Sequence, residues 1–226
     1  MFSMEKVAVL MDVDGTIIQY RDGTPASTWR IMFRVLGIDS SRSLEYMRRY
    51  REVTGEEKEK LIREWIEHDL GEINKKYRKG AVDAAMRELV YAPGLLEFVE
   101  YARRRGWKIG LVSAGFSPLL ERIAQELGVE VLLSLEIRER EGRFEFEYVN
   151  IIDVEEKRKK VEEFQAGGYY VVYIGDGPND REALAAADLG ICIGGDTKAD
   201  YHADDFYEVR EIMERVLSHG KRHGAR

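Results

Sequence analysis

Five apolar residues, Val7 to Met11, lead directly to Asp12 and Asp14, and this arrangement constrains the fold more than any other part of the sequence. A strand without polar alternation is buried on both faces, which is typical of a parallel sheet covered by helices on both sides. In such sheets, ligands bind at the carboxyl ends of the strands. Two carboxylates there, one residue apart, repel each other, which indicates a positive group beside them.

The second half of the chain alternates between strand and helix patterns after the break at Tyr91-Ala-Pro-Gly94. Repeated strand–helix–strand units predict a parallel sheet with right-handed crossovers. A hairpin with its turn at 141–143 is predicted over 137–149. The predicted strands are 107–112, 129–135, 169–174 and 190–193, and the predicted helices are 95–105, 118–127, 155–165, 180–187 and 206–218.

Residues 25 to 87 are rich in charge and carry apolar residues at helical spacing, with no strand pattern. Trp29 and Trp65 stand at positions typical of a core. Because this block separates the first strand from the others, we predict an α/β fold. It would have a Rossmann-like parallel-sheet core and an inserted α-helical cap domain. The expected core domain is residues 1–17 and 91–226, and the expected cap domain is residues 18–90.

The composition narrows the class of protein. The net charge of −7 argues against a nucleic-acid partner. A single cysteine allows no intrachain disulfide and favours a reducing, cytoplasmic location. No apolar run approaches the ~20 residues of a membrane span, so no membrane association is predicted. The 34% of charged residues is typical of proteins from thermophiles.

Three predicted strands are each followed by side chains that can take part in catalysis or ligand binding. The first ends in Asp12 and Asp14, the second in Ser113-Ala-Gly-Phe116, and a later one in Asp176, which Asp180 follows. A lysine-rich helix start, Lys157-Arg-Lys-Lys160, falls between the last two. Each feature alone fits a turn, a helix cap or a solvated helix face. Their convergence on one edge of the sheet favours a site.

Phosphoryl transfer through an aspartate is the chemistry that needs this set. One carboxylate can attack phosphorus, and a second acid can protonate the leaving oxygen and then activate water. Mg²⁺ prefers carboxylate oxygens and keeps several waters, and it would offset the repulsion between the acids. A hydroxyl, backbone amides and a lysine can hold the phosphoryl oxygens.

The motifs DVDGT, LVSAGF and GDGPND, with a lysine between the last two, resemble those of the haloacid dehalogenase-like hydrolase superfamily, in its phosphatase branch. The phrase APGLLEFVEYARRRGWKIGLVSAGF, the helical block and the hairpin are most similar to phosphoserine phosphatase-like members. The resemblance implies a Mg²⁺-dependent phosphomonoester hydrolase that forms an aspartyl-phosphate on a small phosphorylated metabolite. Two alternatives stay open: a phosphotransferase using the same intermediate, and a receiver-like signalling module.

The resemblance also implies a role for each matching residue. Asp12 would be the nucleophile and a metal ligand. Asp14 would be the general acid/base, with its backbone carbonyl on the metal. Lys157 would neutralise the nucleophile and the phosphate, with Lys159 and Lys160 as alternatives.

The binding residues follow in the same way. Ser113 and the amide of Ala114 would hold the phosphoryl group, and Asp176 would be the remaining protein ligand to Mg²⁺. The residues expected to support these groups are Thr16, Asn179 and Asp180.

One position departs from the family pattern. Phosphoserine-specific members carry a glutamate a few residues after the first motif, where this chain has Arg21. An arginine repels an ammonium group and suits a carboxylate or a second phosphate. Phosphoserine is therefore not the expected substrate, and we predict that Arg21 contacts substrate, with Arg30 and Arg34 as further candidates.

Overall fold

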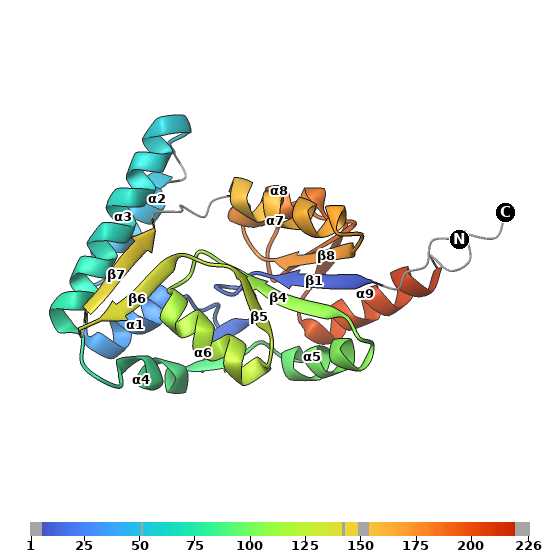
Figure 1. Ribbon diagram of the computed structural model, residues 1–226, viewed down its shortest axis with the longest axis horizontal. Helices are drawn as coiled ribbons and strands as arrows, with labels where there is room; N and C mark the ends of the chain where they lie inside the picture. The colour runs from blue at the N-terminus through green and yellow to red at the C-terminus, as the bar shows by residue number, and fades with distance from the viewer. Residues whose placement is uncertain (1–5, 51, 142, 149–153, 220–226) are drawn as a thin grey trace.

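The computed structural model describes residues 6–50, 52–141, 143–148 and 154–219. Within these ranges, six parallel strands form one sheet in the order β10-β9-β8-β1-β4-β5 (Figure 1). The predicted α/β fold is confirmed. The strands of this sheet are β1 (Val7–Met11), β4 (Lys108–Val112), β5 (Glu130–Leu133), β8 (Tyr170–Gly175), β9 (Leu189–Ile193) and β10 (Tyr201–Ala203).

Strand β1 is apolar throughout because both of its faces are covered. Val7, Val9 and Met11 belong to one hydrophobic cluster, and Ala8 and Leu10 belong to the other. Side chains alternate across a strand, so each face supplies one of two cores. The first core includes buried residues of α5 (Leu95–Arg104), α6 (Ser117–Leu127) and α9 (Phe206–His219), and the second includes residues of α7 (Val154–Ala166) and α8 (Arg181–Ala186).

A helical segment follows β1 and projects to one side of the sheet (Figure 1). Short antiparallel strands frame it at both ends: β2 (Ile18–Tyr20) pairs with β3 (Leu89–Tyr91). This pairing brings the two chain connections of the segment together. Its helices are α1 (Thr28–Leu36), α2 (Ser41–Tyr50), α3 (Gly55–Lys76) and α4 (Ala81–Glu88).

The hairpin of β6 (Glu136–Arg140) and β7 (Arg143–Tyr148) lies against this helical segment, although it follows the sheet strand β5 in the chain. Asn74 on α3 exchanges two hydrogen bonds of 2.7 Å with the backbone of Phe144. Tyr77 donates a hydrogen bond to Glu139 at 2.8 Å. The predicted hairpin is confirmed for its described residues. Gly142 of its turn and Val149 lie outside the described residues.

The short strands β2, β3 and β10 are absent from the sequence prediction. Each contains three residues, which is too short to show a hydrophobic period. The predicted helix 180–187 is α8 (Arg181–Ala186), and a 3-10 turn, Pro178–Asp180, precedes it directly. No helix in the described part of the chain is long and apolar enough to cross a membrane.

Candidate active site

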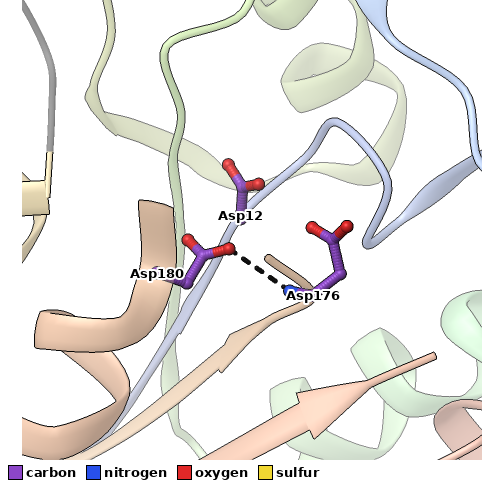
Figure 2. A group of neighbouring side chains, drawn as sticks. All are labelled: Asp12, Asp176 and Asp180. Atoms are coloured by element: carbon purple, nitrogen blue, oxygen red, sulfur yellow. Dashed lines mark hydrogen bonds between the residues drawn. The ribbon is translucent and has the colours of Figure 1, made fainter. Parts of the chain in front are cut away.

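The carboxyl ends of β1 and β8 bring three acids together. Asp12 follows β1 directly, Asp176 follows β8, and Asp180 ends the 3-10 turn after it. Each offers a carboxylate oxygen within 4.8 Å of the other two (Figure 2). Asp12 and Asp180 are buried, and Asp180 accepts hydrogen bonds from the backbone N–H groups of Asp176 and Gly177 at 3.2 Å each. Asp180 therefore fixes the loop that carries Asp176.

Lys157 supplies a positive charge to this acidic cluster. It lies on α7, on the same face as the buried Val161 and Phe164, because residues four and seven positions apart share a helix face. Its Nζ is 3.0 Å from Asp12 Oδ1 and 2.7 Å from Asp180 Oδ1, and its side chain is 1% exposed.

The other two candidate lysines do not reach the cluster. Lys159 pairs with Glu156 at 3.3 Å, and Lys160 pairs with Glu163 at 2.5 Å, both along the helix. Of the three lysines considered, the geometry brings Lys157 to the acids.

Gly15 shapes the loop that follows β1. Its φ is +83°, and a Cβ on this residue would collide with the carboxylate of Asp176. Glycine adopts a positive φ without strain and leaves room for a close neighbour. Thr16, the next residue, donates a hydrogen bond from Oγ1 to Asp176 Oδ1 at 3.1 Å. The Asp-Gly-Thr sequence thus places the first loop directly against Asp176.

The carboxylate of Asp14 is held by the start of α1. It accepts hydrogen bonds from the backbone N–H of Thr28 at 3.0 Å, from Ser27 Oγ at 2.9 Å and from Thr28 Oγ1 at 3.1 Å. A helix N-terminus favours a negative charge. Burial nevertheless raises the pKa of Asp14 above its ordinary value, although these hydrogen bonds oppose the rise. A carboxyl group with a raised pKa is suited to donate and accept a proton.

Ser113 and Ala114 follow β4 at the same edge of the sheet. Ser113 is buried, and its Oγ accepts a hydrogen bond from the backbone N–H of Gly115 at 3.2 Å. Its own N–H donates to the carbonyl of Leu133 on β5. Both residues line the same cavity as Asp12 and Asp14. A hydroxyl and backbone groups are thus available beside the acids.

The cluster carries more negative charge than its lysine offsets. Burial raises the pKa of Asp12 well above its ordinary value; Lys157 opposes the rise, and the other acids add to it. Burial and the charge of Asp180 raise the pKa of Asp176 to about 6. Burial disfavours the charged form of Lys157, but the carboxylates of Asp12 and Asp180 outweigh it and raise that pKa. A divalent cation with oxygen ligands fits such a donor set.

A cavity of about 320 Å³ lies between this sheet edge and the helical segment. From the sheet side it is lined by Asp12, Asp14, Ser113, Ala114, Gly115, Pro178 and Asn179, and from the start of α1 by Ser27, Trp29 and Arg30. We call its lining on α2 and α3 the distal wall, which comprises Ser43, Leu44, Met47, Tyr50, Ile62, Trp65, Ile66 and Asp69.

Two of the predicted substrate-binding arginines lie outside this lining. Arg21 is exposed, and its guanidinium donates a hydrogen bond to the carbonyl of Arg87 at 2.7 Å. Arg34 is 3.9 Å from Glu88 and lies over the ring of Tyr20. Arg30 is the predicted arginine that the structure brings to the cavity.

Several residues of the site were not predicted from the sequence. Ser27 and Thr28 hold Asp14, and Tyr173 donates a hydrogen bond to Asp180 at 2.8 Å. Trp29 and Trp65 line the cavity rather than lying fully in a core. Helical spacing marks a face as apolar, but it cannot say whether protein or ligand covers that face.

Comparison with known proteins identifies a matching family and several relatives. A family model described as haloacid dehalogenase-like hydrolase matches residues 9–185. Phosphoserine phosphatase SerB2 of Mycobacterium tuberculosis is 31% identical over 144 residues, which cover 61% of this chain and 32% of that protein. Phosphoserine phosphatase of Archaeoglobus fulgidus is 36% identical over 103 residues, which cover 43% of this chain and 30% of that protein. The chain thus matches about a third of the length of these two relatives.

The solved structures agree on the fold. A substrate-bound phosphoserine phosphatase complex superposes with a TM-score of 0.71 at 18% identity, over 92% of this chain and 98% of that one. At this level of identity the likeness concerns the fold alone. It includes the sheet and most of the helical segment, since so much of both chains is covered.

Proposed function

Because this chain belongs to the haloacid dehalogenase-like hydrolase family, we propose that it is a Mg²⁺-dependent phosphatase of small phosphomonoesters. The observation that carries the proposal is the placement of Asp12 on the cavity wall, with Lys157 3.0 Å from one of its oxygens. A buried carboxylate at the end of β1, paired with a cation and open to a cavity, is suited to attack phosphorus. The phosphatase names of the two relatives support this chemistry.

The proposed reaction has two steps on the residues of this chain. A carboxylate oxygen of Asp12 attacks phosphorus, the ester P–O bond breaks, and Asp14 gives its proton to the leaving oxygen. Asp14 then takes a proton from a water molecule, whose oxygen attacks the phosphorus of the aspartyl-phosphate. The bond from Asp12 to phosphorus breaks, and phosphate leaves. Ser113 and Ala114 line the cavity where the phosphoryl oxygens would lie, and Lys157 would keep Asp12 anionic.

We propose that Asp12, Asp176 and the backbone carbonyl of Asp14 hold Mg²⁺. The excess negative charge of the acidic cluster supports this assignment. When bound, the ion supplies positive charge that neutralises the acids and the phosphoryl group. Thr16 and Asp180 hold Asp176 and its loop in position, and Asn179 lines the cavity.

We further propose that residues 18–90 act as a cap over a core of residues 1–17 and 91–226. Support comes from the cavity, whose lining is divided between the sheet edge and helices α1 to α3. The general acid/base Asp14 is held by the start of α1, so the position of the cap would affect proton transfer as well as access. The hairpin of β6 and β7 packs on α3 and would form part of this cap unit.

Mg²⁺ removal tests the proposal directly. Hydrolysis of p-nitrophenyl phosphate is expected to fall at least about 100-fold in EDTA and to return with excess Mg²⁺, because a catalytic cation contributes several kcal/mol to the transition state. The unfolding temperature should also rise when Mg²⁺ is added, because a ligand that binds the folded state stabilises it. Full activity in EDTA would contradict the metal assignment, and no activity in folded, Mg²⁺-loaded protein would contradict the phosphatase assignment.

Gly15→Ala should damage the site more than the fold. Both Gly15 and Gly23 have φ +83°, but a Cβ on Gly23 meets nothing within 4 Å, whereas one on Gly15 meets Asp176. Each alanine should cost about 1–2 kcal/mol of stability for its positive φ. Only Gly15→Ala should also lower kcat/KM, by about tenfold or more, because a misplacement of ~1 Å can cost ~100-fold. Equal activity of the two variants would show that Asp176 does not need this close approach.

A further inference from the structure

The distal wall is apolar where the cavity leads away from the acids. Six of its eight residues on α2 and α3 are aliphatic, aromatic or thioether side chains: Leu44, Met47, Tyr50, Ile62, Trp65 and Ile66. Leu44 is 40% exposed, and it is one of three large hydrophobic residues that are exposed in the described part of the chain. An apolar side chain that a folded chain leaves at a cavity is available to cover a ligand.

The polar side chains of the distal wall are occupied by one another. Asp69 Oδ2 accepts hydrogen bonds from Ser43 Oγ at 2.7 Å and from Trp65 Nε1 at 2.9 Å. Its Oδ1 is 2.9 Å from His68 Nδ1. The carboxylate of Asp69 is 4% exposed. These bonds orient Trp65 and leave the apolar atoms of the wall as the surface that a ligand meets.

We infer that the substrate is a phosphomonoester whose alcohol carries a hydrocarbon chain or ring, which packs on the distal wall while the phosphate faces Asp12. The inference rests on the proposed phosphatase function, because it assigns the second half of the same cavity. Continuity supports it, since Asp12, Ser113 and the distal wall line one cavity. The rings of Tyr50 and Trp65, whose centroids are 6.4 Å apart, add aromatic surface to the same wall.

An amino-acid substrate is the competing occupant. Its ammonium group would have to pair with the carboxylate of Asp69, and its carboxylate with the guanidinium of Arg30. Asp69 already has three hydrogen-bonding neighbours, and the aliphatic side chains of the wall offer an ammonium no hydrogen-bond acceptor. Arg21 is turned to the carbonyl of Arg87 and lies outside the cavity lining. The lining therefore favours the apolar alcohol.

The test measures binding and turnover separately. Calorimetry with Mg²⁺-loaded protein would give the Kd of ethyl-, butyl-, hexyl- and phenylphosphonate, which are not hydrolysed. The Kd is expected to fall by roughly threefold to fourfold for each methylene that becomes buried. In parallel, kcat/KM would be measured for the matching n-alkyl phosphates, whose alcohols differ little in acidity, and for O-phosphoserine. We expect hexyl phosphate to be the best of these substrates and O-phosphoserine the poorest.

Variants locate the effect in the distal wall. Leu44→Gln and Met47→Gln should each reduce the ratio of the ethyl- to the hexylphosphonate Kd by about threefold or more. Leu96→Gln is the matched control, since Leu96 is 55% exposed and lies outside this cavity, and it should leave the ratio unchanged. A flat phosphonate series, or a preference for O-phosphoserine, would overturn the inference even if all the esters were hydrolysed. A steep series without hydrolysis of any ester would instead overturn the proposed function and leave the apolar pocket standing.

Discussion

The Asp12→Asn variant is expected to lose at least about 10⁴-fold in turnover, because an amide cannot replace the attacking carboxylate. The fold should survive, since asparagine has nearly the same shape and its carbonyl can still accept from Lys157, now 3.0 Å from Asp12 Oδ1. Burial raises the pKa of Asp12. An acid whose pKa is raised on folding costs stability as the pH rises from its unfolded pKa towards its folded one. Lys157 stays paired with Asp180 at 2.7 Å in this variant, so no buried charge loses its last partner. At pH 7 in EDTA, Asp12→Asn should therefore be as stable as the wild type or more so.

The measurement is turnover of p-nitrophenyl phosphate together with denaturant unfolding in EDTA. Asp204→Asn is the matched control, because Asp204 is exposed and follows the edge strand β10, and it should change neither quantity. Wild-type turnover by Asp12→Asn would rule out Asp12 as the nucleophile. A large loss of stability would show that the Asp12 charge contributes more to the fold than its burial indicates.

The sheet could be predicted because its strands leave unambiguous marks in the sequence. Val7 to Met11 lack polar alternation, and the structure shows why: the strand separates two hydrophobic cores. Strands β4, β8 and β9 were predicted for the same reason, because each is largely buried and comes from an apolar run in the sequence. The three-residue strands β2, β3 and β10 gave no comparable mark, because their pairing depends on partners distant in the chain.

The acidic part of the candidate site could also be predicted from the sequence, since each residue follows a strand. Parallel strands bring their carboxyl ends to one edge, so Asp12, Ser113 and Asp176 were expected at the same edge. The adjacent strands β8, β1 and β4 make them neighbours there. The choice of Lys157 as the lysine of the site needed a further argument. Its place on the buried face of α7 is set by Val161 and Phe164, and charge alone could not separate it from Lys159.

The distal wall and the arginines could not be assigned in this way. Ile62, Trp65 and Ile66 show the same helical spacing whether they face a core or a cavity, and only the packing of α2 and α3 decides between the two. Arg21 was placed by its distance from the first motif. Its side chain extends from a turn after β2, where the carbonyl of Arg87 is the partner within reach.

Lys157→Met should cause the largest loss of stability among the substitutions considered. It leaves Asp12 and Asp180 buried without their cation, and removing one partner of a buried ion pair costs about 3–5 kcal/mol. The two carboxylates raise the pKa of Lys157. A base whose pKa is raised on folding contributes its full stabilisation below its unfolded pKa and loses it as the pH rises through the folded one. The contribution is therefore intact at pH 7. Turnover should fall as well, because the charge of Lys157 lowers the pKa of Asp12 and so favours its anionic form.

Denaturant unfolding in EDTA would measure this loss against Lys159→Met, which removes an exposed pair with Glu156 on the same helix and should cost less than about 1 kcal/mol. The difference in unfolding free energy between Lys157→Met and the wild type should shrink as the pH is lowered, because protonation neutralises the carboxylates that have lost their cation. Combining Lys157→Met with Asp180→Asn should recover part of the stability, since one buried charge is removed. Equal losses for the two lysine variants would show that the buried cation does not stabilise the acidic cluster. Mg²⁺ should raise the unfolding temperature of Lys157→Met by more than that of the wild type, because the cluster without its lysine carries more negative charge for the ion to neutralise.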